Sequence, residues 1–326
     1  MRICFVHQKM MSFVEKDIKI LSGAYQVKNV EVTSFLPRLN VLKAVYGSDL
    51  VFCWFGKMPA FWAVIFARLL NKRSIVVAGG DDVANEPAIG YGLYTKWWKS
   101  WCPDYVFKHC DLVLSVSEFN RSETIKNTGA DENKVKCLYH GFGQEPLPQN
   151  PRDNAVITVG RITRETVIKK GLKLFVRSAS LLPDIKYYLI GPCNDGSLEE
   201  LKKNAPPNII FTGGLYGPEL DNRYAKAKVY VQASYHESFG CSVAEAMLGG
   251  CIPVVSRRAA LPEVAGDTGI YIEEQTPEAV AVAVKKALAL PDGYGLKARQ
   301  RIIDVFPLEK RKEALLKAVE DVMKGK

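Results

Sequence analysis

Short apolar runs alternate along the chain with longer segments in which apolar and polar residues recur at helical spacing. This order is typical of βα units that build a parallel sheet. In the first half it predicts one doubly wound domain. We expect strands at 2–6, 30–35, 50–55, 74–78, 112–116 and 135–139, and helices at 15–22, 59–70, 93–107 and 118–127.

A segment with three prolines and no apolar periodicity, 144–153, predicts a linker. A second series follows, with strands expected at 155–159, 187–190, 209–211, 229–232, 252–255 and 270–272, and helices at 171–182, 198–203, 219–227, 242–248, 277–288 and 294–305. The pattern predicts two Rossmann-like α/β domains, 1–148 and 149–306, that face each other across a cleft. A last helix within 307–326 is expected to pack back across the domain seam.

The composition is that of a globular protein with two cores, because 48% of the 326 residues are hydrophobic and 24% are charged. The net charge of +9 is spread evenly, with 18 Lys and Arg against 14 Asp and Glu in 1–150, and 26 against 21 beyond. This even distribution, without a nucleic-acid-binding motif, argues against a nucleic-acid partner. Attraction to an acidic membrane surface or to anionic substrates remains open.

Eight cysteines show no CxxC pair and no histidine at zinc spacing. Most lie in apolar runs, which favours buried thiols and a reducing, cytoplasmic compartment. The first residues do not make a signal peptide, and no apolar stretch reaches the ~18 residues of a membrane span. We therefore expect a cytoplasmic protein, and association with the cytoplasmic face of a membrane stays open.

The segment 237–256 is the most informative part of the chain. Gly240 permits a sharp entry into a short helix that begins near Cys241, and Gly249 and Gly250 end it. The amide groups of such a helix N-terminus attract anions, and Ser242 can serve its first turn. Glu237 and Glu245 bracket this site as acceptors for hydroxyl groups, so the segment predicts a phosphorylated sugar ligand. The alternative is that Glu245 is an exposed helix residue and Glu237 only complements the helix dipole.

Basic residues follow another strand of the second domain. Gly160 and Arg161 come directly after the strand, and Lys169 and Lys170 precede the next helix. An Arg grips phosphate oxygens with two donors while a Lys adds a point charge. By itself this pattern is better explained by a solvated loop. Together with the Glu237 segment on the same sheet edge, the pattern favours a phosphate site.

In the first domain, flexible or polar residues also follow strands. Gly80 and Asp82 lie in the Gly79-Gly80-Asp81-Asp82 turn, His140 follows the last strand and His7 follows the first. We expect these four residues to line the cleft on the acceptor side, although His140 is equally suited to a hinge or turn. The two aspartates lack a third ligand, so no metal site is predicted.

The stretch 91–101 combines aromatic and basic residues, among them Trp97, Trp98, Trp101, Lys96 and Lys99. Helical core packing is one explanation. The other is an interfacial patch at which Trp and Lys meet lipid head groups.

Taken together, Gly160-Arg161, Lys170-Gly171, Glu237-x7-Glu245 and the following Gly249-Gly250-Cys-Ile-Pro-Val-Val resemble the family 4 retaining glycosyltransferases of the GT-B fold. The resemblance is specific in the second domain. In the first it is looser, where 79–83 looks like the family's His-Gly-x-Asp-Val loop. It implies a nucleotide-diphosphate sugar donor, a lipid-linked, glycan or small-molecule acceptor, and neither a required metal nor a further cofactor.

The resemblance also implies roles for single residues. Arg161 and Lys170 would neutralise the diphosphate leaving group and Glu237 would bind donor-sugar hydroxyls, which makes these three the expected catalytic residues. Glu245 would hold the ribose. The remaining residues expected at the donor are Phe239, Gly240, Cys241, Ser242, Gly160 and Lys169. Lys170 follows Arg161 at more than the family's usual spacing, so Lys169 or Lys170 fills this role at the diphosphate only if 164–168 loop out.

Other functions stay open on the same fold. They are a nucleotide-sugar epimerase, a sugar-phosphate glycosyltransferase, and a membrane-associated relative that has lost catalysis. A dinucleotide oxidoreductase is disfavoured because no G-x-G-x-x-G follows the first strand of either domain.

Overall fold

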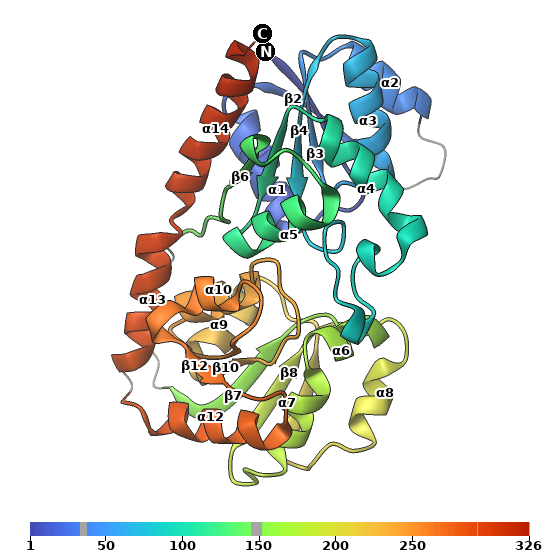
Figure 1. The fold of residues 1–326 in the computed structure, drawn as a ribbon. Helices are drawn as coiled ribbons and strands as arrows, with labels where there is room; N and C mark the ends of the chain where they lie inside the picture. Colours follow the sequence, from blue (N-terminus) through green and yellow to red (C-terminus); the bar gives the residue numbers. More distant parts are fainter. Residues whose placement is uncertain (33–37, 145–151, 292, 326) are drawn as a thin grey trace. The chain divides into compact units, whose positions relative to one another are not determined.

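The computed structural model describes residues 1–32, 38–144, 152–291 and 293–325. The chain forms two compact units, each a six-stranded parallel sheet with helices on its faces (Figure 1). Unit 1 comprises 1–141 together with 308–326, and unit 2 comprises 142–307. The last helix of the chain therefore belongs to the same unit as its first strand.

The sheet of unit 1 has the strand order β2-β1-β3-β4-β5-β6. Its strands are β1 (Arg2–His7), β2 (Gln26–Glu31), β3 (Leu50–Trp54), β4 (Arg73–Ala78), β5 (Leu112–Ser115) and β6 (Val135–Cys137). Its α-helices are α1 (Ser12–Ser22), α2 (Arg38–Tyr46), α3 (Met58–Leu69), α4 (Trp97–His109), α5 (Glu118–Thr128) and α14 (Leu308–Lys324).

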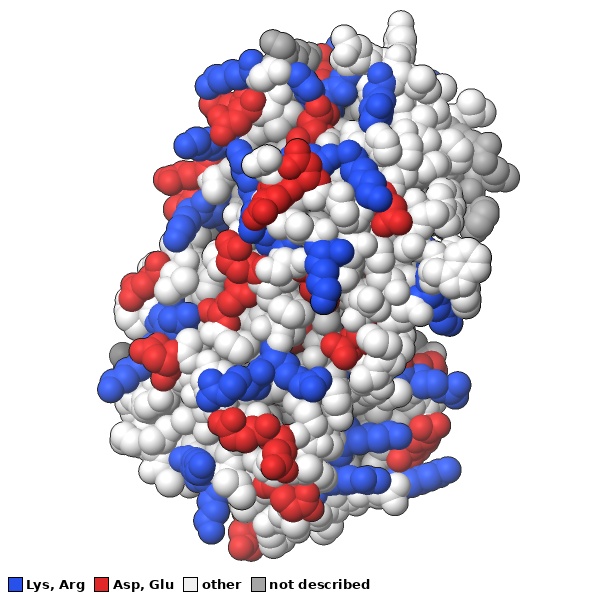
Figure 2. Space-filling view, viewed as in Figure 1, with Lys and Arg blue, Asp and Glu red and all other residues white. Residues whose placement is uncertain are grey.

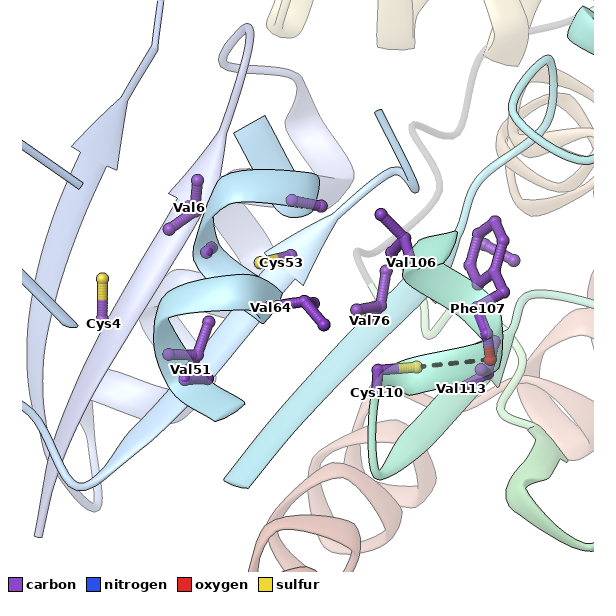
Figure 3. Close-up of a cluster of buried hydrophobic side chains, with 14 of the residues drawn as sticks. Cys4, Val6, Val51, Cys53, Val64, Val76, Val106, Phe107, Cys110 and Val113 are labelled. Carbon is purple, nitrogen blue, oxygen red and sulfur yellow. Dashed lines mark hydrogen bonds between the residues drawn. The ribbon is translucent and has the colours of Figure 1, made fainter. Parts of the chain in front are cut away.

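Alternate residues of each central strand point to opposite faces of this sheet. One face packs against α2, α3 and α4 and forms a core that includes the side chains of Cys4, Val6, Val51, Cys53, Val64, Val76, Val106, Phe107 and Val113 (Figure 3). Helices α1 and α14, which contact each other, lie on the opposite face (Figure 1). The sheet is buried on both sides, which explains why its central strands are continuous apolar runs.

The thiols behave as the sequence predicts. All eight cysteines are free, and five of them are buried. In the core of Figure 3, Cys110 lies with its sulfur 3.8 Å from the carbonyl oxygen of Phe107. Burial raises the pKa of the Cys4 and Cys110 thiols to about 12, so both remain protonated and act as small apolar side chains.

Helix α14 is fixed to unit 1 by a buried ion pair. Arg311 donates to both carboxylate oxygens of Asp17 on α1, at 2.8 and 2.7 Å, and to the carbonyl oxygens of Leu138 and Tyr139. The indole of Trp54 on β3 donates to the same carboxylate at 3.0 Å. The guanidinium thus joins the last helix, the first helix and the end of the sixth strand in one polar network.

In unit 1 one strand was misplaced and one helix was missed. The second strand covers Gln26–Glu31 rather than 30–35, and residues 33–35 of the predicted strand lie outside the described residues. The helix α2 was not expected. Strand β2 is an edge strand with mostly exposed, polar residues, so it lacks the apolar run by which the other strands are found.

Unit 2 contains strands β7 (Asp153–Val159), β8 (Lys186–Ile190), β9 (Ile209–Gly213), β10 (Ala227–Gln232), β11 (Ile252–Ser256) and β12 (Ile270–Ile272). Its α-helices are α6 (Arg164–Lys169), α7 (Leu172–Ala179), α8 (Ser197–Lys202), α9 (Pro218–Lys226), α10 (Cys241–Leu248), α11 (Leu261–Ala265), α12 (Pro277–Ala289) and α13 (Gly293–Val305). The predicted strands and long helices of this unit are present with small shifts of their ends.

The strand order of unit 2, β12-β11-β10-β7-β8-β9, decides where its site lies. The chain runs outward from β7 through β8 to β9, and then returns to place β10 on the other side of β7. The loops after β7 and β10 therefore leave in opposite directions at the carboxyl ends of these strands. Open α/β sheets bind their ligands at such a switch point.

None of the helices within the described ranges combines the length and the apolar character that a membrane span requires.

Candidate functional site

A buried ion pair lies at the switch point of unit 2. The Lys170 ammonium, just before α7, is 3.0 Å from Oε1 of Glu237 in the loop after β10, and both side chains are about 85% buried, with exposures of 15% and 14%. Burial raises the pKa of Glu237, but Lys170, Lys169 and hydrogen bonds from Lys170 and Ser234 outweigh it, so this pKa lies below its ordinary value. Glu237 is therefore a carboxylate at neutral pH.

Side chains of β10 and of the loop after it hold Glu237 in place. The amide nitrogen of Gln232 donates to Oε1 of Glu237 at 3.0 Å, and the hydroxyl of Ser234 donates to the same oxygen at 3.1 Å. The Tyr230 hydroxyl donates to the side-chain amide oxygen Oε1 of Gln232 at 2.7 Å, which orients the amide so that its NH2 group points at the carboxylate. Tyr230 and Gln232 alternate along the buried strand β10 and so share one side of it, and Ser234 lies two residues beyond its end.

The sequence analysis did not identify Gln232, Ser234 or Tyr230 as site residues. The available signal was the alternating Tyr-x-Gln-x-Ser pattern of 230–234, which leads from a buried strand toward Glu237.

Lys169 and Lys170 are fixed by backbone contacts with the loop after β10. Tyr235 donates its amide to the carbonyl of Lys169 at 2.8 Å, and a Cβ on Gly171 would meet the carbonyl oxygen of Ala233 at 2.1 Å. Gly171 also has a φ of +62°, which L side chains rarely adopt. The close approach of Gly171 to the backbone of Ala233 therefore requires glycine, and it places Lys170 beside Glu237.

The residues 164–168, on whose path the role of Lys169 and Lys170 depends, form a helix between Arg161 and Lys170. These residues belong to α6, which begins with a capping box in which Thr163 and Thr166 exchange hydrogen bonds. The extra spacing between Arg161 and Lys170 is thus taken up by one short helix. A helix rises only ~1.5 Å per residue, so these residues add little length to the connection between Arg161 and Lys170.

Gly160 and Arg161 leave β7 at the edge of the same site. A Cβ on Gly160 would lie 2.8 Å from Cδ of Lys170, so the glycine leaves space for the lysine stem. Arg161 is exposed, and its guanidinium has no hydrogen bond or ion pair to the described residues. It is a cation available to a ligand.

Helix α10 begins beside this group. Gly240 precedes it with a φ of +106° and has no side chain to cap the first-turn amides. The side chain of Phe239 is buried and packs against the rings of Phe142 and Phe306, at 5.9 and 5.3 Å between centroids. The buried ring of Phe239 therefore anchors the loop that leads into α10. Cys241 and Ser242 are half-buried in the first turn, and Ser242 hydrogen-bonds Tyr230.

Glu245 lies one turn further along α10 and is half-buried. The hydroxyl of Tyr224 on α9 donates to its Oε2 at 3.5 Å. Burial and then the charge of Glu245 raise the pKa of Tyr224 well above its ordinary value, so the phenol stays a donor. The two carboxylates predicted for the site are thus held by different elements, Glu237 by β10 and Glu245 by α9.

The candidates in unit 1 have structural partners. Asp82 is fully buried and accepts backbone amide hydrogens from Gly56, Gly79 and Gly80, which joins the loops after β3 and β4. Burial, and then the charge of Asp81, raise its pKa to about 6 against these hydrogen bonds. Asp81 pairs instead with Lys57 at 2.6 Å. In the described residues no three His, Cys, Asp or Glu side chains gather as they would around a metal ion.

The two histidines are both buried. Nε2 of His7 lies 2.8 Å from Oδ1 of Asn29 on β2. His140 stacks against Trp54 with an interplanar angle of 5° and packs on Phe13. Burial, and then the positive charges of Arg311 and Lys16, hold the pKa of His140 well below its ordinary value. It is a neutral ring at physiological pH.

The family comparison covers the unit in which the ion pair lies. Residues 143–304 match the model of the "Glycosyl transferases group 1". These residues belong to the group 1 glycosyl transferase family. The group 1 domain contains every residue expected at the donor, from Gly160 to Glu245, and coincides with the second Rossmann-like unit.

Curated relatives share part of the chain. The O-antigen chain mannosyltransferase B of Escherichia coli is 25% identical over 199 residues, which are 54% of this chain and 51% of the relative. The sulfoquinovosyl transferase SQD2 of Arabidopsis thaliana is 36% identical over 160 residues, 47% of this chain and 30% of the relative. The GDP-mannose-dependent alpha-mannosyltransferase of Mycobacterium tuberculosis is 29% identical over 153 residues, which are 44% of this chain and 37% of the relative. The chain spans about half the length of these relatives or less.

Solved structures confirm the predicted GT-B fold. Anabaena Alr3699/HepE, solved in complex with UDP and glucose, has a TM-score of 0.81 at 15% identity and covers 98% of this chain and 100% of its own. The sucrose-phosphate synthase of Thermosynechococcus elongatus has a TM-score of 0.79 at 16% identity and covers both chains completely. The likeness extends over both units of the protein.

Proposed function

We propose that the protein is a retaining glycosyltransferase that moves a sugar from a nucleotide-diphosphate sugar to a lipid-linked, glycan or small-molecule acceptor. The observation that carries this proposal is the buried Lys170–Glu237 pair at the switch point of the group 1 domain. It combines a cation for a phosphate with a carboxylate for hydroxyl groups. The names of the mannosyl and sulfoquinovosyl relatives support sugar transfer.

In this proposal the diphosphate lies against Arg161, Lys169 and Lys170. Breaking the glycosyl–phosphate bond builds negative charge on the leaving diphosphate. Fixed cations stabilise that charge more strongly as it grows, which lowers the barrier. The ion pair with Glu237 keeps Lys170 extended before the donor arrives, so little reorganisation is needed. Because these side chains supply positive charge, the proposed reaction needs no metal and no further cofactor.

The two carboxylates bind the two ends of the donor. Glu237 accepts hydrogen bonds from hydroxyls of the transferred sugar, and Glu245 accepts them from the ribose. The backbone amides from Phe239 to Ser242 at the start of α10 face the phosphates or the sugar. No side-chain nucleophile is assigned, because in retention of this kind the acceptor attacks from the face that the phosphate leaves.

The acceptor is proposed to use unit 1, through the surroundings of His7, Gly80, Asp82 and His140. The buried partners of these residues suggest that they shape the acceptor loops rather than take part in the chemistry. We place the reaction in the cytoplasm, where nucleotide sugars are available as donors.

A donor-binding experiment tests the function directly. UDP-glucose and GDP-mannose are titrated against the full chain, with the melting temperature and calorimetric affinity as readouts. Glu245→Gln and Arg161→Ala should each weaken donor binding about tenfold or more, because each removes a charge-assisted contact. Arg164→Ala, which removes an exposed arginine three residues later on α6, is the matched control and should bind normally.

Turnover then separates the alternatives. Transfer to an acceptor with retained configuration supports the proposal, whereas epimerised free sugar nucleotide without any acceptor would assign an epimerase. Donor binding without transfer or hydrolysis would assign a relative that has lost catalysis. Unchanged affinity in both Glu245→Gln and Arg161→Ala would refute the donor site itself.

A further inference from the structure

One face of unit 1 exposes large apolar side chains on three neighbouring helices. Trp97, Trp98 and Trp101 at the start of α4 are 83%, 55% and 52% exposed. Leu69 at the end of α3 is also exposed, as are Leu39 and Tyr46 of α2. Soluble surfaces rarely gather so many large apolar residues, and such a patch marks a docking site.

The aromatic rings of α3 and α4 are continuous. Phe61 on α3 packs edge-on against Trp101 and Tyr105 of α4, with centroids 5.2 and 5.1 Å apart. Trp62 and Phe66 extend the row along α3 at 6.0 Å. All of these rings belong to helices that cover the same sheet face. We call the exposed residues of α2, α3 and α4, with Lys96, the aromatic face.

The aromatic face is basic. From Leu39 onward, α2, α3 and α4 contain Lys43, Arg68, Lys99 and Lys108 but a single carboxylate, Asp104, which accepts a hydrogen bond from Tyr94. By contrast, α14 on the opposite sheet face balances its five basic residues with four carboxylates, Glu309, Glu313, Glu320 and Asp321. In Figure 2 the flank over α3 and α4 is mostly white, whereas red and blue side chains alternate over α14.

The order of residues at the start of α4 places cations beside the most exposed rings. The ammonium of Lys96 lies 5.9 Å from the centre of the Trp98 ring, and Lys99 follows in the same turn. The rings of Trp97 and Trp98 are perpendicular, with their centroids 5.9 Å apart, and both remain more than half exposed. Tryptophan prefers the head-group level of a bilayer, and lysine beside it pairs with lipid phosphates.

We propose that the aromatic face docks unit 1 on the surface of an anionic phospholipid bilayer. Self-association through this face is disfavoured, because a two-fold interface would bring the basic residues of both copies, Lys96 and Lys99 among them, into one interface. This proposal goes beyond the proposed transferase activity and is measured without donor or acceptor, so either can fail without the other.

Vesicle co-sedimentation of the full chain tests it. The protein should bind phosphatidylcholine vesicles that contain phosphatidylglycerol and not pure phosphatidylcholine, and salt of about 1 M should release it. Lys96→Glu/Lys99→Glu should weaken binding by roughly thirtyfold or more, since each lysine near an anionic surface contributes about a factor of five. Lys310→Glu/Lys317→Glu reverses two exposed lysines on α14 of the same unit and is the matched control, expected to bind as the unmodified protein does.

A second variant keeps the test decisive if charge reversal disturbs folding. Trp97→Ser/Trp98→Ser retains every charge, should leave the melting temperature unchanged, and should lose the blue shift of tryptophan fluorescence on adding anionic vesicles. Equal binding to both kinds of vesicle, or undiminished binding by both variants, would overturn the proposal. So would concentration-dependent dimerisation without lipid that Trp97→Ser/Trp98→Ser abolishes.

Discussion

Lys170 and Glu237 are 67 positions apart in the sequence, yet their charged groups lie 3.0 Å apart with little exposure to solvent. A buried ion pair of this kind contributes less to stability than its Coulomb energy suggests, because both groups lose their hydration. Its position at the switch point of the sheet is therefore better explained by ligand binding than by folding.

Replacing Lys170 separates the two explanations. Lys170→Met should lower turnover about a hundredfold, because a fixed cation at a developing charge is lost. The free energy of unfolding should fall by only about 1–3 kcal/mol, since Gln232 and Ser234 still donate to Glu237. Lys173→Met, which removes an exposed lysine on the following helix, serves as the control. Equal turnover in the two variants would contradict a role for Lys170 in the reaction.

Gln232 is expected to position Glu237. Gln232→Leu removes the amide that donates to the carboxylate, which should raise the pKa of Glu237 and lower turnover about tenfold. The acidic limb of the pH–rate profile should move to higher pH, a change that a packing defect alone does not produce. Gln300→Leu, at an exposed glutamine on α13, should leave the profile unchanged. An unshifted limb in Gln232→Leu would rule out this role.

Gly171 is expected to be irreplaceable for steric reasons. Gly171→Ala places a methyl group 2.1 Å from the carbonyl oxygen of Ala233 and forces alanine to a φ of +62°. Gly196→Ala has a similar φ of +75° with open space around it, so it isolates the backbone strain, about 1–2 kcal/mol. Urea unfolding should show a clearly larger loss for Gly171→Ala. Equal losses would mean that the loop after β10 moves aside freely.

The pair of Arg311 and Asp17 should dominate the attachment of α14. Arg311→Leu leaves a buried carboxylate unpaired and should cost about 3–5 kcal/mol in the free energy of unfolding. Asp17→Leu/Arg311→Leu removes both charges and should be less destabilised than Arg311→Leu alone. Lys312→Leu, at the exposed neighbouring residue, is the control. A double variant no better than the single one would show that the ion pair is not what fixes the helix.

His140 should make stability depend on pH. The folded protein keeps the ring neutral, whereas the unfolded chain takes up a proton below the ordinary pKa of about 6.5. The stability due to His140 is therefore present above that pH and is lost as the pH falls below it, by up to about 1.4 kcal/mol per pH unit. Unfolding measured from about pH 7.5 to about pH 5.5 should show a shallower slope for His140→Phe, which keeps the stacking on Trp54. Parallel slopes would contradict this.

The sequence by itself determined most of the fold, because the two sheets are buried on both faces. Their central strands are then continuous apolar runs, and the helices between them show helical periodicity, so both are visible locally. The edge strand β2, which buries little, was misplaced for the same reason. The spacing of Glu237 and Glu245 around Gly240 likewise indicated an anion site from local chemistry alone.

Only the tertiary structure decided which distant side chains meet. Lys170 reaches Glu237 because β10 returns beside β7, and Arg311 reaches Asp17 across 294 positions because α14 packs beside α1. Likewise, α6 absorbs the extra residues before Lys170, and the alternating Tyr230, Gln232 and Ser234 turn their polar groups toward Glu237. Contacts of this kind follow from strand order and side-chain direction, which no local pattern encodes, whereas burial and periodicity leave their mark on every segment of the chain.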